Sequence, residues 1–198
     1  MARGLILVRH AMPEVVPGLS STLWRLGAPA REDCVLLAHA LPAGLAPAVI
    51  SSGQPKVDET AAIIALRGSL TTKVDGRMRE VDQPDAWYEG DYRTLAACYL
   101  AGDEPAGWEP RDAVAARFSA AAAAALAQPG EGDAVIVNHG LALSLYLATL
   151  APTVRSADGL AAFDLVPFWR ALTFPDAWRL DPATGTLERV FHAGLAPD

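Results

Sequence analysis

Two short apolar strands, each followed directly by a histidine, constrain this chain more than any other feature. Gly4–Val8 is an apolar, branched run that ends at Arg9-His10, and Ala134–Val137 is followed by Asn138-His139-Gly140. Such runs are typical of strands that are buried on both faces of a parallel sheet. Because ligands of open α/β sheets bind beyond the carboxyl ends of the strands, we expect both histidines to face one site there.

The rest of the chain alternates between strand-like and helix-like segments. Strands are predicted at 46–51, 70–74, 160–166, 177–180 and 186–191, and helices at 31–41, 54–66, 93–101, 111–128 and 141–150. Residues 13–30 are rich in Pro, Gly and Ser and are predicted as a loop. A turn at 181–185 joins the last two strands into a hairpin at a sheet edge. Residues 82–110 are predicted to form an insertion that covers a site.

Composition narrows the class of protein. A chain of 198 residues suits one domain, 1–198, with a single core around a sheet. Its net charge of -7 disfavours nucleic acid and anionic membranes as partners. Cys34 and Cys98 lack a CxxC spacing and are predicted to be buried thiols, which is consistent with a reducing compartment. The N-terminal apolar run is too short for a signal peptide, and polar residues divide the stretch 134–151, so we predict a cytoplasmic protein without a membrane span.

The residues at the two strand ends suit phosphoryl transfer. A neutral imidazole such as His10 can attack phosphorus and pass the group on to water. Arg9 supplies a fork of donors for phosphate oxygens, and His139 supplies another charged donor if a nearby phosphate dianion favours its protonated form. The helix that begins near Gly140 favours an anion through its unpaired N–H groups. Spacing alone does not choose the proton donor among the 23 acidic residues.

Four segments resemble the motifs of the histidine phosphatase, or phosphoglycerate mutase-like, superfamily. Leu7 to Pro13 resembles its RHG signature, and Val137 to Gly140 its later His-Gly element. Ser51 to Ala61 is similar to SSxxxRAxxTA, and Met78 to Asp82, followed by Trp87-Tyr88-Glu89-Gly90, to the LxE segment before WEG. All four occur in the family's order between residues 5 and 145. The resemblance therefore covers most of the chain.

The resemblance implies a role for each matching residue. His10 is phosphorylated, Arg9, Lys56 and His139 surround the phosphate, and Glu80 donates the proton. It also implies a three-layer α/β/α sandwich with a mostly parallel central sheet, antiparallel strands toward the C-terminal edge, and catalysis without a metal or other cofactor.

Several positions depart from the family's pattern. Ala11 replaces glycine, Pro13 replaces a common Thr or Ser, and Val16 stands where the mutases carry asparagine. Lys56 replaces arginine, which keeps the charge but loses the bidentate fork. Asn138 replaces a common serine beside His139.

These observations predict a phosphomonoesterase that acts on a small phosphorylated metabolite or a phosphoprotein. The alternatives are a phosphoglycerate mutase and a non-catalytic module that binds a phosphorylated ligand. A homodimer is possible. Asp82 and Glu89 are reserve candidates for the proton donor, and His39 and His192 are predicted to be structural. The candidates for the substrate pocket are Met12, Trp87, Tyr88 and Trp108.

Overall fold

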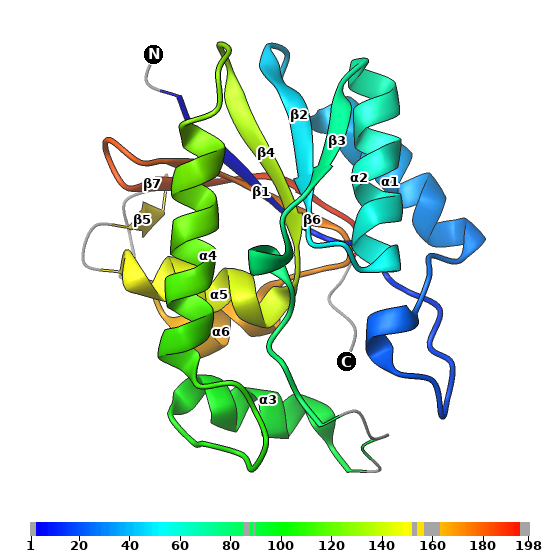
Figure 1. Cartoon of the computed structure of the whole chain (residues 1–198), viewed down its shortest axis with the longest axis vertical. Coiled ribbons are helices and arrows are strands. Elements are labelled where there is room, and N and C mark those ends of the chain that lie inside the picture. Colours follow the sequence, from blue (N-terminus) through cyan, green and yellow to red (C-terminus); the bar gives the residue numbers. More distant parts are fainter. Residues whose placement is uncertain (1–2, 85–87, 89, 152–153, 157–162, 195–198) are drawn as a thin grey trace.

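A seven-stranded mixed sheet forms the centre of the molecule (Figure 1). A computed structural model describes residues 3–84, 88, 90–151, 154–156 and 163–194. The strand order is β3-β2-β4-β1-β6-β7-β5. In chain order the strands are β1 (Leu5–Arg9), β2 (Leu45–Ser51), β3 (Thr71–Val74), β4 (Asp133–Asn138), β5 (Arg155–Ser156), β6 (Asp176–Asp181) and β7 (Thr186–His192). Pairings among β1 to β4 are parallel, whereas β6 is antiparallel to both β1 and β7.

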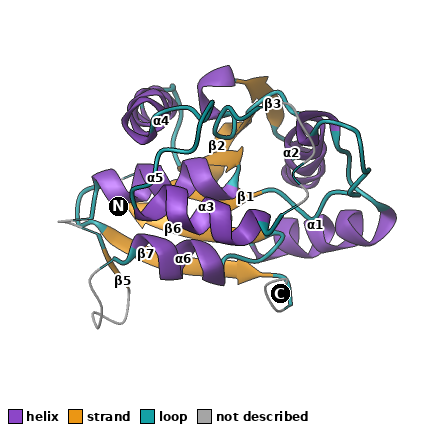
Figure 2. Ribbon diagram, turned by 90° about the horizontal axis from the view of Figure 1, so that it is seen from below, coloured by secondary structure: helices purple, strands orange, loops and turns teal. Residues whose placement is uncertain are grey.

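Helices cover both faces of this sheet (Figure 2). Alternate side chains of β1 explain the arrangement, because Leu5 and Leu7 point into one core and Ile6 and Val8 into another. One core contains helices α3 (Tyr92–Ala101), α4 (Arg111–Leu126), α5 (Gly140–Thr149) and α6 (Leu165–Ala171). The other contains α1 (Ala28–Ala40) and α2 (Pro55–Gly68). The expected three-layer α/β/α sandwich with a mostly parallel sheet is thus confirmed.

Most predicted elements are confirmed, with shifted ends. Helix α1 begins at Ala28 rather than Arg31, with Pro29 in its first turn, where proline is favoured. The predicted loop before it contains a short 3-10 helix, η1 (Ser21–Leu23). The β6–β7 hairpin lies toward one edge of the sheet, with the two-residue β5 outside it.

One predicted strand is wrong. Of the segment 160–166, the structure describes 163–166, where Phe163 and Asp164 are irregular and α6 starts at Leu165. A short apolar run has no periodicity that separates a buried strand from a buried helix, so the pattern was ambiguous. In the described part of the chain, no helix has the length and apolar character needed to cross a bilayer.

Candidate active site

Strand register brings the two histidines together. Arg9 on β1 pairs with Asn138 on β4 in parallel, so the next residue of each strand leaves the sheet at the same edge. The His10 amide donates to the Asn138 carbonyl over 3.0 Å, which extends the ladder by one bond. The ring centroids of His10 and His139 lie 5.2 Å apart, edge to face, and both residues are buried. The expected convergence at the carboxyl ends of the strands is present.

The His10 ring is held in one tautomer. Its Nδ1 lies 2.7 Å from the carbonyl oxygen of Ala11, which only accepts, so Nδ1 carries the hydrogen. Nε2 therefore keeps its lone pair. Burial, with Lys56 nearby, holds the pKa of His10 well below its ordinary value, so the ring is neutral at pH 7. The Ala11 amide is itself bound to Thr60 Oγ1 over 3.2 Å, which fixes this turn.

Ser52 orients His139. The Ser52 hydroxyl lies 2.9 Å from His139 Nε2, and Ser52 directly follows β2, the neighbour of β4. Burial and the neighbouring His10 keep the pKa of His139 well below its ordinary value. Asn138 takes a different partner, because its amide donates weakly to the Ile136 carbonyl at 3.5 Å. Ser52 was not among the predicted site residues, although its place directly after a buried strand is the signal that identified both histidines.

Arg9 is packed tightly against the two neighbouring loops. Its guanidinium lies 3.4 Å from the centre of the Phe174 ring, and its Nη1 donates to the Leu172 carbonyl over 2.8 Å. A Cβ atom at Gly140 would lie only 3.1 Å from Arg9 Nε, so glycine makes room for this side chain. Nε is buried and has no acceptor among the described residues. Burial lowers the pKa of Arg9 to about 10, which leaves it charged at pH 7.

Lys56 supplies a second cation from the first turn of α2. Its side chain is buried, and its Nζ donates to the Ser21 carbonyl over 2.6 Å and lies 5.8 Å from the Trp24 ring centre. Burial lowers the pKa of Lys56 to about 8. Lys56 is also close enough to lower the pKa of both His10 and His139. The predicted position of Lys56 beside the histidines is therefore supported by its electrostatic effects.

Glu80 caps the helix that follows His139. Its carboxylate accepts from the amides of Leu141 and Ala142 over 3.2 and 2.9 Å, and from the amide of Val81. Burial raises the pKa of Glu80 more than these three N–H groups lower it. Glu80 is thus a carboxyl group with a raised pKa at the start of α5, directly after His139, and it interacts electrostatically with Arg9 and Lys56.

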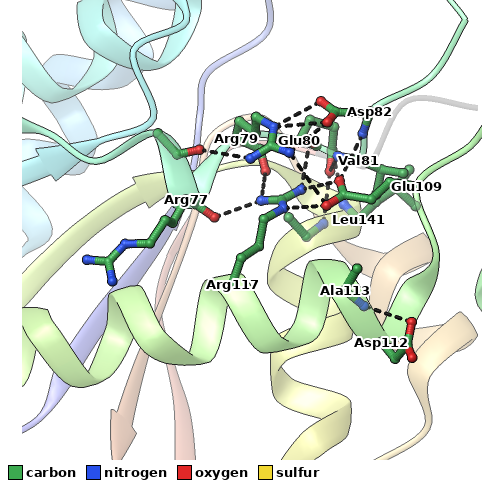
Figure 3. Close-up of polar contacts among 12 residues, drawn as sticks. Arg77, Arg79, Glu80, Val81, Asp82, Glu109, Asp112, Ala113, Arg117 and Leu141 are labelled. Carbon is green, nitrogen blue, oxygen red and sulfur yellow. Dashed lines mark hydrogen bonds and ion pairs between the residues drawn. The ribbon is translucent and has the colours of Figure 1, made fainter.

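A single arginine of α4 holds the main chain around Glu80 (Figure 3). Arg117 donates through Nη1 to the carbonyls of Arg77 and Arg79, and through Nη2 to the carbonyl of Glu80. It also donates to both carboxylate oxygens of Glu109, from Nε and Nη2, over 2.8 Å each. The reserve candidate Asp82 is committed to an ion pair with Arg79, which holds its pKa below the ordinary value.

The predicted pocket residues have different environments. Met12 and Tyr88 are exposed. Trp108 packs against the core, where its ring contacts Tyr99 at 4.9 Å and Tyr92 at 6.1 Å. Trp87 and Glu89 lie outside the described residues.

Two positions that depart from the family's motif, and a second residue that sequence reasoning missed, are placed as follows. Pro13 is buried and bridges to Leu26, whereas Val16 is exposed. Phe174, whose ring lies 5.3 Å from that of His10, comes from the loop between α6 and β6, and no sequence pattern pointed to it.

Comparisons with known proteins identify the family and the fold. The sequence model of the histidine phosphatase superfamily (branch 1) matches residues 5–158. No curated protein sequence matches the chain significantly. A mycobacterial glucosyl-3-phosphoglycerate phosphatase in complex with VO3 superposes with a TM-score of 0.72 at 22% identity, over 98% of this chain and 100% of that one. YhfR of Bacillus stearothermophilus superposes with a TM-score of 0.67 at 20% identity, over 99% and 98%. At these identities the structures show a shared fold.

Proposed function

The chain belongs to the histidine phosphatase superfamily (branch 1), whose phosphoglycerate mutase-like fold it shares, and we propose that it is a phosphomonoesterase acting through phosphorylated His10. The observation that carries this proposal is the cluster of His10, His139, Arg9 and Lys56, with Glu80 bound to the helix that follows His139. The pKa of each of the four basic groups is lowered and that of the acid is raised. A bound phosphate dianion would relieve every downward shift in the four basic groups.

In the first step, the His10 Nε2 lone pair forms a bond to phosphorus while the bond from phosphorus to the ester oxygen breaks. The departing electron pair stays on that oxygen, which takes a proton from Glu80. The alcohol leaves, and the phosphoryl group is held on His10. Arg9, Lys56 and His139 stabilise the charge on the oxygens in transit, and Arg9 Nε gains the acceptor that it otherwise lacks.

In the second step, water attacks phosphorus as the bond to Nε2 breaks, and the Glu80 carboxylate takes the proton of the water. Inorganic phosphate leaves and the enzyme returns to its first state. His10 Nδ1 keeps its hydrogen on the Ala11 carbonyl throughout, which holds the ring in the attacking orientation. No metal is required by this sequence, because cationic side chains supply the charge.

We propose a small phosphorylated metabolite or a phosphoprotein as the substrate. Support for the phosphate group, though not for the alcohol that carries it, comes from a neighbour of similar fold, the mycobacterial glucosyl-3-phosphoglycerate phosphatase, solved with VO3 and with inorganic phosphate. Cys34 is buried as predicted, whereas Cys98, also predicted to be buried, is only partly so. Both are free thiols, which fits a reducing compartment, and we propose the cytoplasm.

The test is release of phosphate from 4-nitrophenyl phosphate by the wild type and by His10→Ala. We expect the variant to lose at least about 1000-fold in kcat/KM, because it removes the nucleophile. Rapid quenching should trap an acid-labile, alkali-stable phosphoprotein in the wild type only. Equal background rates for both proteins would point to a binding module, and interconversion of phosphoglycerates without phosphate release would indicate a mutase.

A further inference from the structure

The loop that follows His10 exposes an unusual number of large apolar side chains. Five of them, each between 38% and 54% exposed, lie within twelve residues: Met12, Val15, Val16, Leu19 and Leu23. Glu14 is the one charged residue between positions 12 and 24. Several large apolar side chains exposed on one short loop beside a candidate active site are candidates for binding the apolar part of a ligand. We call these five side chains the apolar rim.

The loop that carries the apolar rim is anchored to the candidate active site. Lys56 Nζ donates to the Ser21 carbonyl, and Trp24 Nε1 donates to the Leu19 carbonyl over 3.1 Å. Glu59 of α2 forms an ion pair with Arg25 and accepts from the amide of Leu26. The loop is therefore fixed at its start by the turn of His10 and at its end by α2.

One aromatic side chain, Tyr92, lies near Glu80. Tyr88 and Tyr92 are exposed, and Tyr92 is close enough for Glu80 to contribute to the raised pKa of its hydroxyl. That hydroxyl accepts from Gln83 over 2.9 Å, so the ring is held in place. The loop and α3 lie on the side of the molecule where the central strands end (Figure 1). The alcohol part of a substrate, whose oxygen must contact Glu80, would lie between them.

We propose that the substrate is a phosphate monoester of an apolar alcohol, with an alkyl, isoprenoid-like or aryl body lying on the apolar rim. This inference rests on the proposed phosphatase function. A sugar or a carboxylate-bearing alcohol would need hydrogen-bond donors and charges along the rim, and the rim side chains supply neither. An apolar body gains by leaving water at this place.

The test is kcat/KM for a series of primary alkyl phosphates from ethyl to decyl, with glycerol 1-phosphate as the polar member. All members release a primary alcohol, so differences along the alkyl series report binding of the alcohol body. We expect a rise of about two- to fourfold for each methylene that the rim buries, and a lower value for glycerol phosphate than for propyl phosphate. A flat series, or preference for glycerol phosphate, would overturn the inference.

Variants of the apolar rim test whether its side chains cause the preference for long alkyl chains. In Leu23→Ser and Val15→Ser, the ratio of kcat/KM for octyl over ethyl phosphate should fall at least about fivefold. Leu66→Ser is the matched control, since Leu66 is exposed near the end of α2 far from the histidines, and should keep the wild-type ratio. If Leu23→Ser keeps the ratio but dissociates a dimer in analytical ultracentrifugation, the rim is a contact between copies of the chain. If the wild type hydrolyses no ester better than His10→Ala does, the proposed function itself has failed.

A second inference concerns Arg117 and follows from separate contacts. A guanidinium has five N–H bonds, and five acceptor atoms surround that of Arg117, three of them main-chain carbonyls at residues 77, 79 and 80. The side chains of Arg117 and Glu109 are each 12% exposed. Glu109 in turn accepts from the amide of Asp82 and donates its own amide to the Asp82 carbonyl. The chain on both sides of Glu80 is thus bound to one side chain (Figure 3).

The geometry points to Arg117 as a positioning residue that aims the Glu80 carboxyl group at the leaving oxygen. Arg117 donates to the Glu80 main chain and leaves its carboxylate free for the amides at the start of α5. The guanidinium therefore fixes where Glu80 stands without competing for the proton. A lysine has three donors and no planar fork, so it satisfies only part of this set.

The test is the dependence of kcat/KM on the leaving group in Arg117→Met and Arg117→Lys. An alcohol is a poor leaving group unless it is protonated, whereas 4-nitrophenolate leaves readily without a proton. A misplaced acid should therefore lower kcat/KM for alkyl esters far more than kcat/KM for 4-nitrophenyl phosphate. We expect kcat/KM of Arg117→Met to fall about 100-fold for butyl phosphate and less than about tenfold for 4-nitrophenyl phosphate. The values for Arg117→Lys should lie between those of Arg117→Met and those of the wild type.

Arg111→Met is the matched control, because Arg111 lies on the same helix and donates to the carbonyls of Leu100 and Gly102, away from Glu80. Arg111→Met should lower kcat/KM for butyl phosphate and for 4-nitrophenyl phosphate by the same small factor. Equal losses on both esters in folded Arg117→Met would assign it a merely structural role. Should that variant fail to fold, the result for Arg117→Lys decides in the same way.

Discussion

At the scale of the residue, the most informative contact is the short one from His10 Nδ1 to the carbonyl of its neighbour Ala11. It leaves Nε2 as the free nitrogen without help from any other side chain. The common glycine at position 11 is thus not needed for this contact, since a main-chain oxygen provides it. Ala11 places its methyl group in a small core cluster with Leu26, Ala30 and Cys34.

Lys56 gives the site an alkaline limit. Its pKa of about 8 means that the site loses one cation as the pH rises through that value. With 4-nitrophenyl phosphate, which needs little help from the acid, kcat/KM should fall above pH 8. Arg stays charged there, so Lys56→Arg should keep its activity to at least one pH unit higher. A pH profile of both proteins checks this, and coincident alkaline limbs would contradict the assignment.

Glu80→Gln should reveal the proton donor. Because the pKa of Glu80 is raised, its acid form persists to a higher pH than that of an ordinary glutamate and is lost as the pH rises further. We expect kcat/KM for butyl phosphate to drop about 100- to 1000-fold in Glu80→Gln, and the loss on 4-nitrophenyl phosphate to be much smaller. The part of the alkaline fall that deprotonation of Glu80 causes with the alkyl ester should disappear, and the fall above pH 8 that Lys56 causes should remain. A uniform loss on both substrates would assign the proton to another group.

Sequence reasoning located the residues that follow strands better than those on loops. His10 and His139 were identified because they end apolar runs, and the same rule applied to the strand 46–51 indicates Ser52. Phe174 stacks on Arg9 from a loop whose path depends on α6 and β6 together. A loop residue has no periodicity to reveal such a contact, so only the folded chain shows it.

At the scale of the element, helix α5 joins the two halves of the site. Its first residue, Gly140, packs on Arg9, and its free amides bind Glu80. An anion at a helix N-terminus is favoured by the N–H groups and by the helix dipole. The acid and one cation are therefore both placed by a single helix end.

Gly140→Ala should separate activity from stability. Alanine suits a helix, but its Cβ would lie 3.1 to 3.3 Å from three atoms of the Arg9 guanidinium and would displace it. We expect kcat/KM to fall at least about tenfold, with Tm changed by less than about 2 °C. Gly27→Ala is the control, since its Cβ would meet nothing closer than 3.9 Å. Unchanged activity in Gly140→Ala would argue against a role for Arg9 in holding phosphate.

Helices and strands with strong periodicity were predictable, and marginal ones were not. The alternation of buried runs and helical patterns in the first 150 residues predicted the strands and helices in their order along the chain, whereas the order of the strands in the sheet comes from the structure. The strand predicted for 160–166 was wrong, because the apolar run there is too short to show a period that separates a strand from a helix. The pairing of two-residue β5 with β7 is set by the tertiary fold alone.

At the scale of the whole molecule, the buried histidines link folding to pH. In the unfolded chain each has a pKa near 6.5, whereas in the folded chain each pKa lies well below that value. As the pH falls from 6.5 to 5.5, His10 and His139 therefore bind protons in the unfolded chain but stay neutral in the folded chain. The free energy of unfolding should decrease by about 1 kcal/mol for each histidine over this range.

Urea denaturation at the two pH values measures this effect. The double variant His10→Asn with His139→Asn should lack about 2 kcal/mol of the decrease that the wild type shows. A wild type whose stability is the same or greater at pH 5.5 would contradict the buried, neutral state of the two rings.

The pairing of Arg9 with Asn138 has a wider consequence for which substitutions around the two histidines the site can tolerate. The separation of the two imidazoles is fixed by main-chain hydrogen bonds between adjacent strands, which any pair of apolar sequences can form. Side chains around the two rings, such as Lys56 or Ala11, can therefore be substituted without changing the strand pairing that sets their separation. If the proposed reaction holds, such substitutions would alter which substrates are accepted and leave the nucleophile and its partner in register.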